Sequence, residues 1–420
     1  MKRILFVVDQ PCPCGICNAL AALLSEFDYS RFEITVLFTM SDPRWPELQP
    51  RLSPKCKVYV VDRREGVSFE RPYPHLLMHR TARILAHAQD EFDRADSGWF
   101  LRFAKRVLRT RPFCWLVKPV GIFLEAFERR LYVRYVRQVM PRSDFDTVIL
   151  YAPYATEVAV RTFTWKQFLL VYHNGVKEEM PKAHVDLGYR TCDRFIGVSH
   201  GLVPDLQQWW PQYAHKMMAI PNAIETQVIR LRAEEDIAEM FSPDVVNIVS
   251  CGRLCYWKGM DLAIEAVRLL VSEGFSKIHL WIIGWDSEYE NLKRQIEEAG
   301  LTDTVSLLGA RANPYPYMRR ADIYLQPSRK EAFGLTIQEA LLLESPVVAT
   351  RTRGSVELIE QRKLKGVLCE ISGAGIYAAL RPLVTDPSAR AALRNRDLAV
   401  RLDAERRDAA RQFEKLFDEV

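Results

Sequence analysis

The sequence feature that most constrains the fold is a regular alternation of short apolar runs with segments of helical periodicity. Strands that alternate with helices form parallel sheets, because a helix must carry the chain back between one strand and the next. The apolar runs are residues 4–8, 32–38, 57–61, 147–151, 168–172 and 194–198, and then 245–251, 278–283, 305–308, 322–326, 346–350 and 366–369. Two sets of about six strands predict an α/β protein with two doubly wound domains.

Pro221 and Asn222 punctuate the chain after the sixth run and mark the expected join. We therefore expect an N-terminal domain over residues 1–222 and a C-terminal domain over residues 223–395. The last segment, residues 396–420, has one apolar face at helical spacing, formed by Ala409, Phe413, Leu416, Phe417 and Val420. We expect this C-terminal helix to pack back on the N-terminal domain.

Composition is that of a globular protein, with 48% apolar and 26% charged residues. No run reaches the roughly 20 uncharged apolar residues that a membrane span needs. The first apolar run is short and ends at Asp9, so it indicates a strand and not a signal peptide. Nine cysteines without an export signal predict reduced thiols in the cytosol.

The densest site signal is PSRKEAFGLTIQEA, residues 327–340, where a strand ends and a helix begins near Gly334. Unpaired amides at a helix start attract phosphate, and Gly334 would let a ligand approach the backbone closely. Glu331 before the helix and Glu339 two turns into it can accept hydrogen bonds from sugar hydroxyls. One segment therefore offers donors for a diphosphate between two acceptors for sugars.

Two further loops follow predicted strands at their carboxyl ends, where open α/β sheets bind ligands. In VSCGRLCYWKG, the cations Arg253 and Lys258 would suit a diphosphate, although solvated surface charges fit the same residues equally well. In LLVYHNGV, a strand delivers His173 and Asn174 to its tip. A lone histidine is more often structural than catalytic, but its place at a strand end favours a site.

These segments together resemble retaining glycosyltransferase family 4, whose members have the GT-B fold. EAFGLTIQEA has the family's Glu-x7-Glu spacing, and GRLCYWKG, VYHNG, FIGVSHG, IPNAIE, LLGA and SPVVAT are each similar to a family motif, in the family's order. The resemblance covers nearly the whole chain and is strongest from about 245 to 370. It implies two Rossmann-like domains facing a central cleft, with the acceptor on the N-terminal side and a nucleotide sugar on the C-terminal domain.

The resemblance also implies residue roles. His173 and Glu331 would be the catalytic pair, His173 meeting the donor sugar across the cleft and Glu331 holding it. The donor-binding set would be Gly15, Asn174, Arg253, Lys258, Gly309, Arg311, Phe333, Gly334, Leu335 and Glu339. In that set the two cations grip the diphosphate, the amides of residues 333–335 bind phosphate, Glu339 accepts from the ribose, and the backbone near residues 309–311 receives the base.

The implied enzyme is a retaining hexosyltransferase of surface or capsular polysaccharide synthesis. It would move a sugar from a UDP- or GDP-linked donor to a glycan or lipid-linked acceptor, with no cofactor and no metal, and the leaving diphosphate would help deprotonate the acceptor. A non-hydrolysing nucleotide-sugar epimerase shares the two-domain fold and is one alternative. A catalytically inactive nucleotide-sugar sensor is another, although His173, Arg253, Lys258, Glu331 and Glu339 occur together.

One segment carries the basic character of the chain. Residues 101–142 contain eleven Lys or Arg and two Glu, a local balance of +9, which leaves −4 for the remainder of a chain whose net charge is +5. Aromatic residues interleave these cations over 99–142, as in interfacial helices that attract anionic lipid. We expect this segment to hold a cytoplasmic protein peripherally at the inner membrane face. An ordinary helical face is the alternative, and without a nucleic-acid module no nucleic acid is expected.

Three cysteines, Cys12, Cys14 and Cys17, lie in the turn after the first strand, where the family has a glycine-rich turn. Gly15 is the residue expected to matter there. A zinc or iron–sulfur site would need a fourth ligand, and no second cysteine cluster supplies one. A Cys14–Cys17 redox pair would need a thioredoxin-like architecture that nothing else indicates. We therefore expect incidental cysteines in a loop that approaches phosphate.

Two other motifs are expected to carry no chemistry. Asp144-Phe145-Asp146 resembles an Asp-x-Asp metal motif but precedes a strand instead of ending one, so we expect a surface turn. Residues 373–378 fit a dinucleotide fingerprint, but they lie late in the chain and no acidic residue stands at a strand end about 20 positions later. Glu344-Ser345 and Gly354-Ser355 stand where the family often has glycines.

Overall fold

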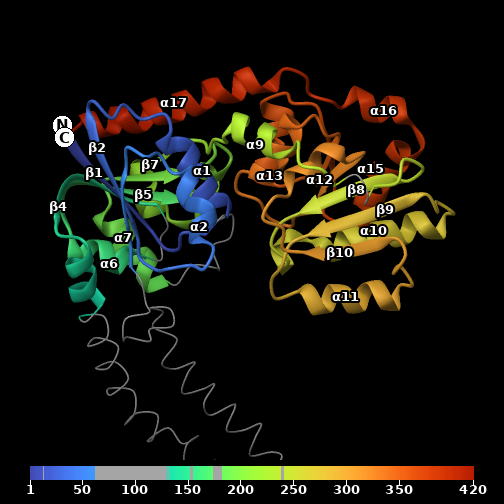
Figure 1. Ribbon diagram of the computed structural model, residues 1–420, viewed down its shortest axis with the longest axis horizontal. Coiled ribbons are helices and arrows are strands. Elements are labelled where there is room, and N and C mark those ends of the chain that lie inside the picture. The colour runs from blue at the N-terminus through green and yellow to red at the C-terminus, as the bar shows by residue number, and fades with distance from the viewer. Residues whose placement is uncertain (13, 62–129, 131, 152–154, 174–181, 238–240) are drawn as a thin grey trace, which may run out of the picture.

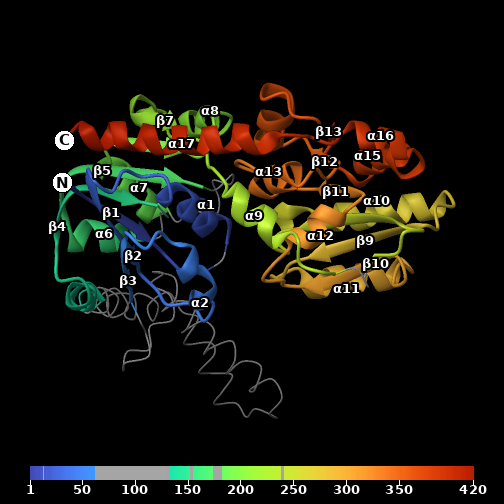
Figure 2. The same cartoon turned by 45° about the horizontal axis from the view of Figure 1, so that its top comes forward.

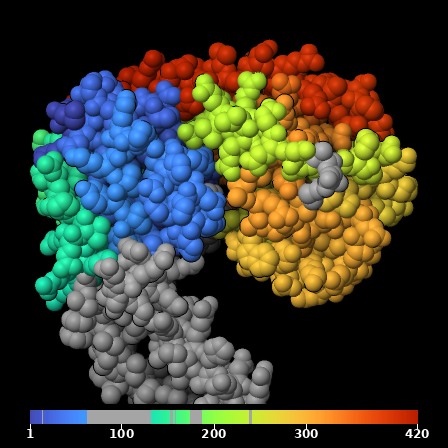
Figure 3. Space-filling model, viewed as in Figure 1, coloured from blue at the N-terminus to red at the C-terminus, as the bar shows by residue number. Residues whose placement is uncertain are grey.

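The computed structural model describes the whole chain except residues 13, 62–129, 131, 152–154, 174–181 and 238–240. Two parallel sheets, each covered by helices, form two domains side by side (Figure 1). This arrangement confirms the predicted pair of doubly wound α/β domains. Figure 3 shows a recess between the blue first domain and the orange second domain.

The first sheet has the strand order β3-β2-β1-β4-β5-β6-β7, and every described pairing is parallel. The strands are β1 (Lys2–Val8), β2 (Phe32–Phe38), β3 (Lys57–Val60), β4 (Asp144–Leu150), β5 (Thr164–Tyr172), β6 (Arg194–Gly197) and β7 (Met217–Ala219). Ile4 in β1 pairs with Ile34 on one side and Thr147 on the other. The strand order reverses between β1 and β4, so a topological switch point lies where the chain leaves β1.

Helices cover both faces of this sheet. They are α1 (Gly15–Leu24), α2 (Trp45–Leu48), α6 (Thr156–Thr162), α7 (Lys182–Thr191) and α8 (Leu202–Trp209), with 3-10 turns at Gln49–Arg51 and Pro211–Lys216. Residues 4–8 of β1 are at most 1% exposed, as expected for a strand that is buried on both faces.

The second sheet has the order β10-β9-β8-β11-β12-β13 and is also parallel. Its strands are β8 (Val246–Cys251), β9 (Ile278–Ile283), β10 (Val305–Gly309), β11 (Ile323–Gln326), β12 (Val347–Thr350) and β13 (Val367–Cys369). Around it lie α9 (Thr226–Arg232), a 3-10 turn at Tyr256–Lys258, α10 (Met260–Ser272), α11 (Tyr289–Glu298), α12 (Tyr315–Arg320), α13 (Leu335–Leu342), α14 (Arg353–Val356) with a π turn at Glu357–Gln361, α15 (Gly373–Thr385) and α16 (Pro387–Ala392). The switch point here lies between β8 and β11.

The last helix, α17 (Leu398–Asp418), runs across both domains (Figure 2). Leu398 and Leu402 near its start belong to a core of the second domain. Phe413 and Phe417 near its end are buried in the core of the first domain, where the Phe417 ring lies 5.6 Å from that of Phe27. One helix therefore packs into both cores and holds the domains together.

The predicted strands agree with the structure, with ends that differ by at most four residues. One strand was missed: β7 is an edge strand of three residues, too short to produce a periodic pattern. The surface turn predicted at residues 144–146 is wrong, because these residues begin β4. Asp146 is buried, accepts a hydrogen bond from the Arg3 amide at 2.9 Å and pairs with Lys166 at 2.7 Å.

Of the basic segment 99–142, residues 99–129 and 131 lie outside the described residues, so its membrane contact stays a prediction. Residues 132–139 are helical. Tyr132, Val136 and Met140, spaced four apart, are buried in the core of the first domain. This end of the segment is an ordinary amphipathic helix. None of the helices in the described part of the chain has the length and hydropathy to cross a membrane.

The packing of α17 predicts a large cost for truncating Phe417, which is 0% exposed and contacts both Phe27 and Phe32. Phe417→Ala should lower the free energy of unfolding by about 3–5 kcal/mol. Val400 on the same helix is 76% exposed. Val400→Ala is the control and should change stability by less than about 0.5 kcal/mol. Urea unfolding followed by circular dichroism measures both, and equal effects would contradict the packing of α17 on the first domain.

Candidate functional site

The two loops at the switch point of the second sheet lie side by side, because β8 and β11 are paired neighbours. The loop after β8 carries Lys258 and the loop after β11 carries Glu331. The Lys258 Nζ lies 2.5 Å from a carboxylate oxygen of Glu331, and the side chains are 19% and 14% exposed. The structure thus joins two of the residues that the sequence singled out.

A glycine allows the two loops to come this close. Gly259 has φ +66°, and a Cβ at this position would lie only 2.1 Å from the carbonyl oxygen of Pro327. The amide of Arg329 also donates to the carbonyl of Trp257 at 2.8 Å. Lys258 is therefore held by a backbone contact that a side chain at position 259 would block.

A buried polar network fixes the carboxylate of Glu331. Ser328 Oγ donates to Glu331 at 3.4 Å and accepts from Gln326 Nε2 at 2.7 Å. Thr350 Oγ1 donates to the Ser328 carbonyl at 2.5 Å, and Thr336 Oγ1 donates to Gln326 Oε1 at 2.9 Å. Because each member is bonded to another, the network holds Glu331 in one orientation.

The helix start next to Glu331 is open. Gly334 is the N-cap of α13, with φ +88° and no side chain to cap the first amides. Gly354 packs closely against this turn. Its amide donates to the Glu331 carbonyl at 3.0 Å, and a Cβ at position 354 would lie 2.4 Å from the carbonyl oxygen of Phe333. The turn 333–335 is thereby clamped at the start of a helix whose first amides no side chain caps.

The first residues of α1 and α13 meet across the domains. A Cβ on Gly15 would lie 3.2 Å from the Leu335 side chain. Cys14, the N-cap of α1, also makes no side-chain capping bond. Two uncapped helix starts therefore converge between the domains, which creates a region of positive potential.

Glu339 lies deeper in the second domain and is 6% exposed. It accepts a hydrogen bond from the Tyr315 hydroxyl at 3.2 Å. Burial raises the pKa of Glu339 to about 7, although Tyr315 and the charges of Arg51 and Arg232 act to lower it. Arg51 belongs to the first domain, so the pKa of Glu339 also depends on a charge from across the domain interface.

His173 follows β5 in the first domain. Its ring lies 4.7 Å from that of Tyr151, and its Nδ1 lies 3.4 Å from the side-chain amide of Asn222. Burial lowers the pKa of His173 to about 4, against opposing effects of Cys14 and of a backbone hydrogen bond at Tyr151. Its Nε2 is buried without a hydrogen-bond partner among the described residues. The imidazole is therefore neutral at neutral pH.

Three further predicted donor-binding residues lie on other loops and strand ends of the second domain. The Arg253 side chain is 63% exposed and pairs with Asp286 at 3.7 Å. Gly309, with φ +71°, ends the edge strand β10, and the exposed Arg311 follows it. Asn174 lies outside the described residues. The donor-binding roles of these four residues stay predictions.

The motif FIGVSHG is similar to a family motif, but no residue in it was predicted to have a role. The Ser199 hydroxyl donates to the Ala332 carbonyl at 2.6 Å, and the Gly201 amide donates to Glu357 at 2.7 Å. These bonds tie the first domain to the second, one directly before the clamped turn and the other at the π turn after α14. Arg51 and Tyr315 at Glu339 were also missed, and no local pattern marks them.

A pocket of about 400 Å³ adjoins Glu331. It is lined by both domains, through Gly201, Leu202, Asp205, Trp209, Arg329, Lys330, Glu331, Arg351, Thr352, Arg353, Val356 and Gln361. Three of its cations are paired: Arg329 with Asp261 at 2.6 Å, Arg351 with Glu360 at 2.6 Å and Arg353 with Asp205 at 2.9 Å. The pocket therefore gives Glu331 a second approach, from the side of α8.

The site lies within a region that matches a known family. Residues 233–397 match the model of Glycosyl transferases group 1. The chain is 29% identical over 163 residues to the lipopolysaccharide core biosynthesis glycosyltransferase LpsE of Rhizobium meliloti (strain 1021), covering 38% of this chain and 46% of that protein. It is also 29% identical over 227 residues to N-acetylgalactosamine-N,N'-diacetylbacillosaminyl-diphospho-undecaprenol 4-alpha-N-acetylgalactosaminyltransferase of Campylobacter jejuni, covering 53% and 59%. The chain spans about half the length of the curated relatives it matches.

Solved structures resemble the whole chain. Anabaena Alr3699/HepE, crystallised with UDP and glucose, has a TM-score of 0.65 at 16% identity and covers 100% of both chains. WaaG, a glycosyltransferase involved in lipopolysaccharide biosynthesis, has a TM-score of 0.55 at 13% identity and covers 97% of this chain and 95% of its own. At these identities the likeness concerns the fold alone, and it confirms the GT-B architecture.

The buried Glu339 makes stability depend on pH. Its pKa of about 7 in the folded protein exceeds the ordinary 4.5, so folding favours the protonated carboxyl. The resulting stability is fully present below about pH 4.5 and is lost as the pH rises through about 7. Glu339→Gln should therefore become more stable than the wild type as the pH rises, by up to about 3 kcal/mol. Urea unfolding of both proteins across this range measures the difference, and a difference that does not vary with pH would contradict the assignment.

Proposed function

We propose that the protein is a retaining glycosyltransferase that moves a sugar from a UDP- or GDP-linked donor to a glycan or lipid-linked acceptor. The observation that carries the proposal is the Lys258–Glu331 pair beside the uncapped start of α13. A cation, free amides and a fixed carboxylate on one clamped turn suit a diphosphate joined to a sugar.

In this proposal the donor diphosphate binds between Lys258 and the amides of residues 333–335. The phosphate oxygens draw the ammonium group of Lys258 away from Glu331, because they accept from it more strongly than a carboxylate that already has Ser328 as a partner. Glu331 is then free to accept from the hydroxyls of the sugar. Glu339, farther along α13, accepts from the ribose.

The same groups would stabilise the transition state. As the bond from sugar to phosphate breaks, negative charge grows on the leaving diphosphate, and Lys258 and the helix amides would stabilise it. The neutral His173 would hydrogen-bond a hydroxyl of the sugar from the first domain through its Nε2. The acceptor enters on the face of the sugar that the diphosphate leaves, and the anomeric configuration is therefore retained. The acceptor hydroxyl gives its proton to the leaving diphosphate. Since Lys258 and the amides neutralise the leaving group, we propose that transfer needs no metal.

The pocket beside Glu331 suits the approach of an acceptor, because it reaches the same carboxylate from the opposite domain. Relatives named for lipopolysaccharide core, amylovoran and diphospho-undecaprenol products support a role in surface polysaccharide synthesis. A lipid-linked acceptor would place the protein peripherally at the cytoplasmic face of the membrane, with the basic segment 99–142 as the proposed contact.

Donor binding can be tested without knowing the acceptor. A nucleotide sugar at a hundred times its Kd should add about 2.7 kcal/mol of stability, visible as a rise in Tm. Lys258→Ala should abolish this rise, because it removes the cation that faces the diphosphate. The shift is compared within each variant, since losing Lys258 also leaves Glu331 without its ion pair. Lys293→Ala, at an exposed position on α11, is the control and should keep the rise. An unchanged rise in Lys258→Ala would remove Lys258 from the site.

Product analysis distinguishes the glycosyltransferase hypothesis from the epimerase and sensor hypotheses. A glycosyltransferase extends an acceptor, and NMR of the first product reports whether the anomeric configuration is retained. An epimerase instead returns a changed sugar on an unchanged nucleotide. Donor binding without turnover across a broad acceptor panel would leave only a sensor.

A further inference from the structure

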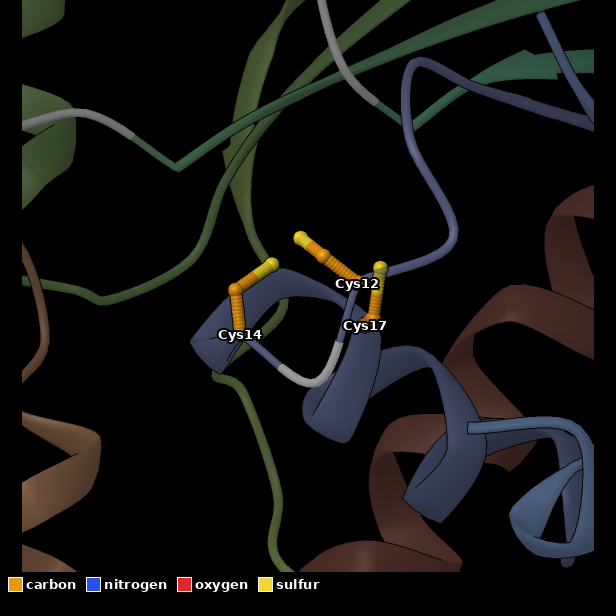
Figure 4. Close-up of side chains that lie close together, drawn as sticks. All are labelled: Cys12, Cys14 and Cys17. Atoms are coloured by element: carbon orange, nitrogen blue, oxygen red, sulfur yellow. The ribbon is translucent and has the colours of Figure 1, made fainter. Parts of the chain in front are cut away.

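The loop between β1 and α1 and the first turn of α1 hold three cysteines that the proposed transfer reaction does not use. The sulfur atoms of Cys12, Cys14 and Cys17 all lie within 4.8 Å of one another. Figure 4 shows Cys12 and Cys14 on the loop before α1 and Cys17 on the helix, with the three sulfur ends near one another. No other group of three Cys, His, Asp or Glu with metal-ligand geometry occurs among the described residues.

The backbone brings these side chains together. The Cys14 amide donates to the Cys12 carbonyl at 2.7 Å, which keeps the first two cysteines close. Cys14 is the N-cap of α1, and Cys17, three positions later, shares its side of the first helical turn. The Cys17 thiol donates to the Gln10 carbonyl at 3.2 Å, which orients it back toward the turn. The cluster is thus a product of the way strand β1 leads into helix α1.

The three sulfurs are placed as thiolate ligands require. All three cysteines are free, and Cys12 and Cys17 are 9% and 1% exposed. Around a tetrahedral Zn²⁺ with bonds of about 2.3 Å, sulfur atoms lie about 3.8 Å apart. Small side-chain rotations would bring sulfurs that now lie within 4.8 Å to that spacing.

The charge of such a site suits its position. Thiolates select soft or borderline ions such as Zn²⁺ over Mg²⁺ or Ca²⁺. Three thiolates and one Zn²⁺ carry a net charge of −1, and the uncapped amides at the start of α1 favour negative charge. The sequence argued against a zinc site because no second cysteine cluster supplies a fourth ligand. This argument does not hold for a site with three protein ligands, in which the fourth position keeps a water molecule.

We propose that Cys12, Cys14 and Cys17 bind one Zn²⁺ ion as three thiolate ligands. Binding releases the thiol protons, so affinity rises with pH. The ion would pin the turn that carries Gly15, the residue in contact with Leu335 at the start of α13. Binding of the ion does not depend on the proposed transfer reaction.

Cobalt substitution tests the site directly in the wild-type full-length chain. The protein is reduced, stripped of metal and titrated with Co²⁺ under anaerobic conditions. We expect one equivalent to produce the thiolate-to-cobalt charge-transfer absorption and the intense d–d bands of a tetrahedral site, and Zn²⁺ to displace it. Absence of these bands would overturn the proposal. A mass of the unligated protein that is two hydrogens too low would also overturn it, because that loss shows a disulfide instead.

Variants then identify the ligands. Zn²⁺ affinity is measured by competition with a chromophoric chelator. Cys12→Ser, Cys14→Ser and Cys17→Ser should each weaken binding at least tenfold, because even outer partners of metal ligands contribute about 10–100-fold. Cys56→Ser, at a half-buried position in the same domain, is the matched control and should leave affinity unchanged. Equal affinity in all four variants would overturn the assignment, and if a variant misfolds the wild-type cobalt spectrum still decides. Donor binding is measured separately, so failure here leaves the transferase proposal standing.

Discussion

The contact between Lys258 and Glu331 is the interaction on which the candidate site depends. The two residues are 73 positions apart in sequence and meet because β8 and β11 are neighbours at the switch point of the second sheet. Gly259 lets their loops touch, and Gly354 closes the turn from the other side. Leaving either charge of such a partly buried pair without a partner is costly, so the pair favours a ligand that replaces one partner with an equivalent group.

The site is completed only when both domains are held in place. Ser199 and Gly201 bond to the clamped turn and to the π turn after α14, and Gly15 meets Leu335. Ala332 and Phe333, beside this turn, also belong to the buried core of the first domain. Helix α17 adds an apolar connection, with its first turns in one core and its last turns in the other. The spacing between the starts of α1 and α13 therefore depends on a helix far from the site in sequence.

Local patterns were enough to predict the strands and the loops at their carboxyl ends, because buried parallel strands are continuous apolar runs. They also indicated Lys258, Glu331 and Gly334, which lie where such loops bind ligands. Arg51 and Tyr315 could not be found this way, since their proximity to Glu339 arises from packing between distant elements. The three cysteines were visible in the sequence, but spacing alone could not reveal that their sulfurs converge.

The two helix starts that meet between the domains take different partners in this scheme. A zinc–thiolate group would occupy the start of α1 with a net negative charge, and that helix would then offer little attraction to a phosphate. The start of α13, with Gly334 as its cap and Lys258 beside it, would keep its positive potential. The donor diphosphate would accordingly bind on the second domain alone. The first domain would then contribute mainly neutral groups such as His173, which suit the sugar and the acceptor better than the phosphates.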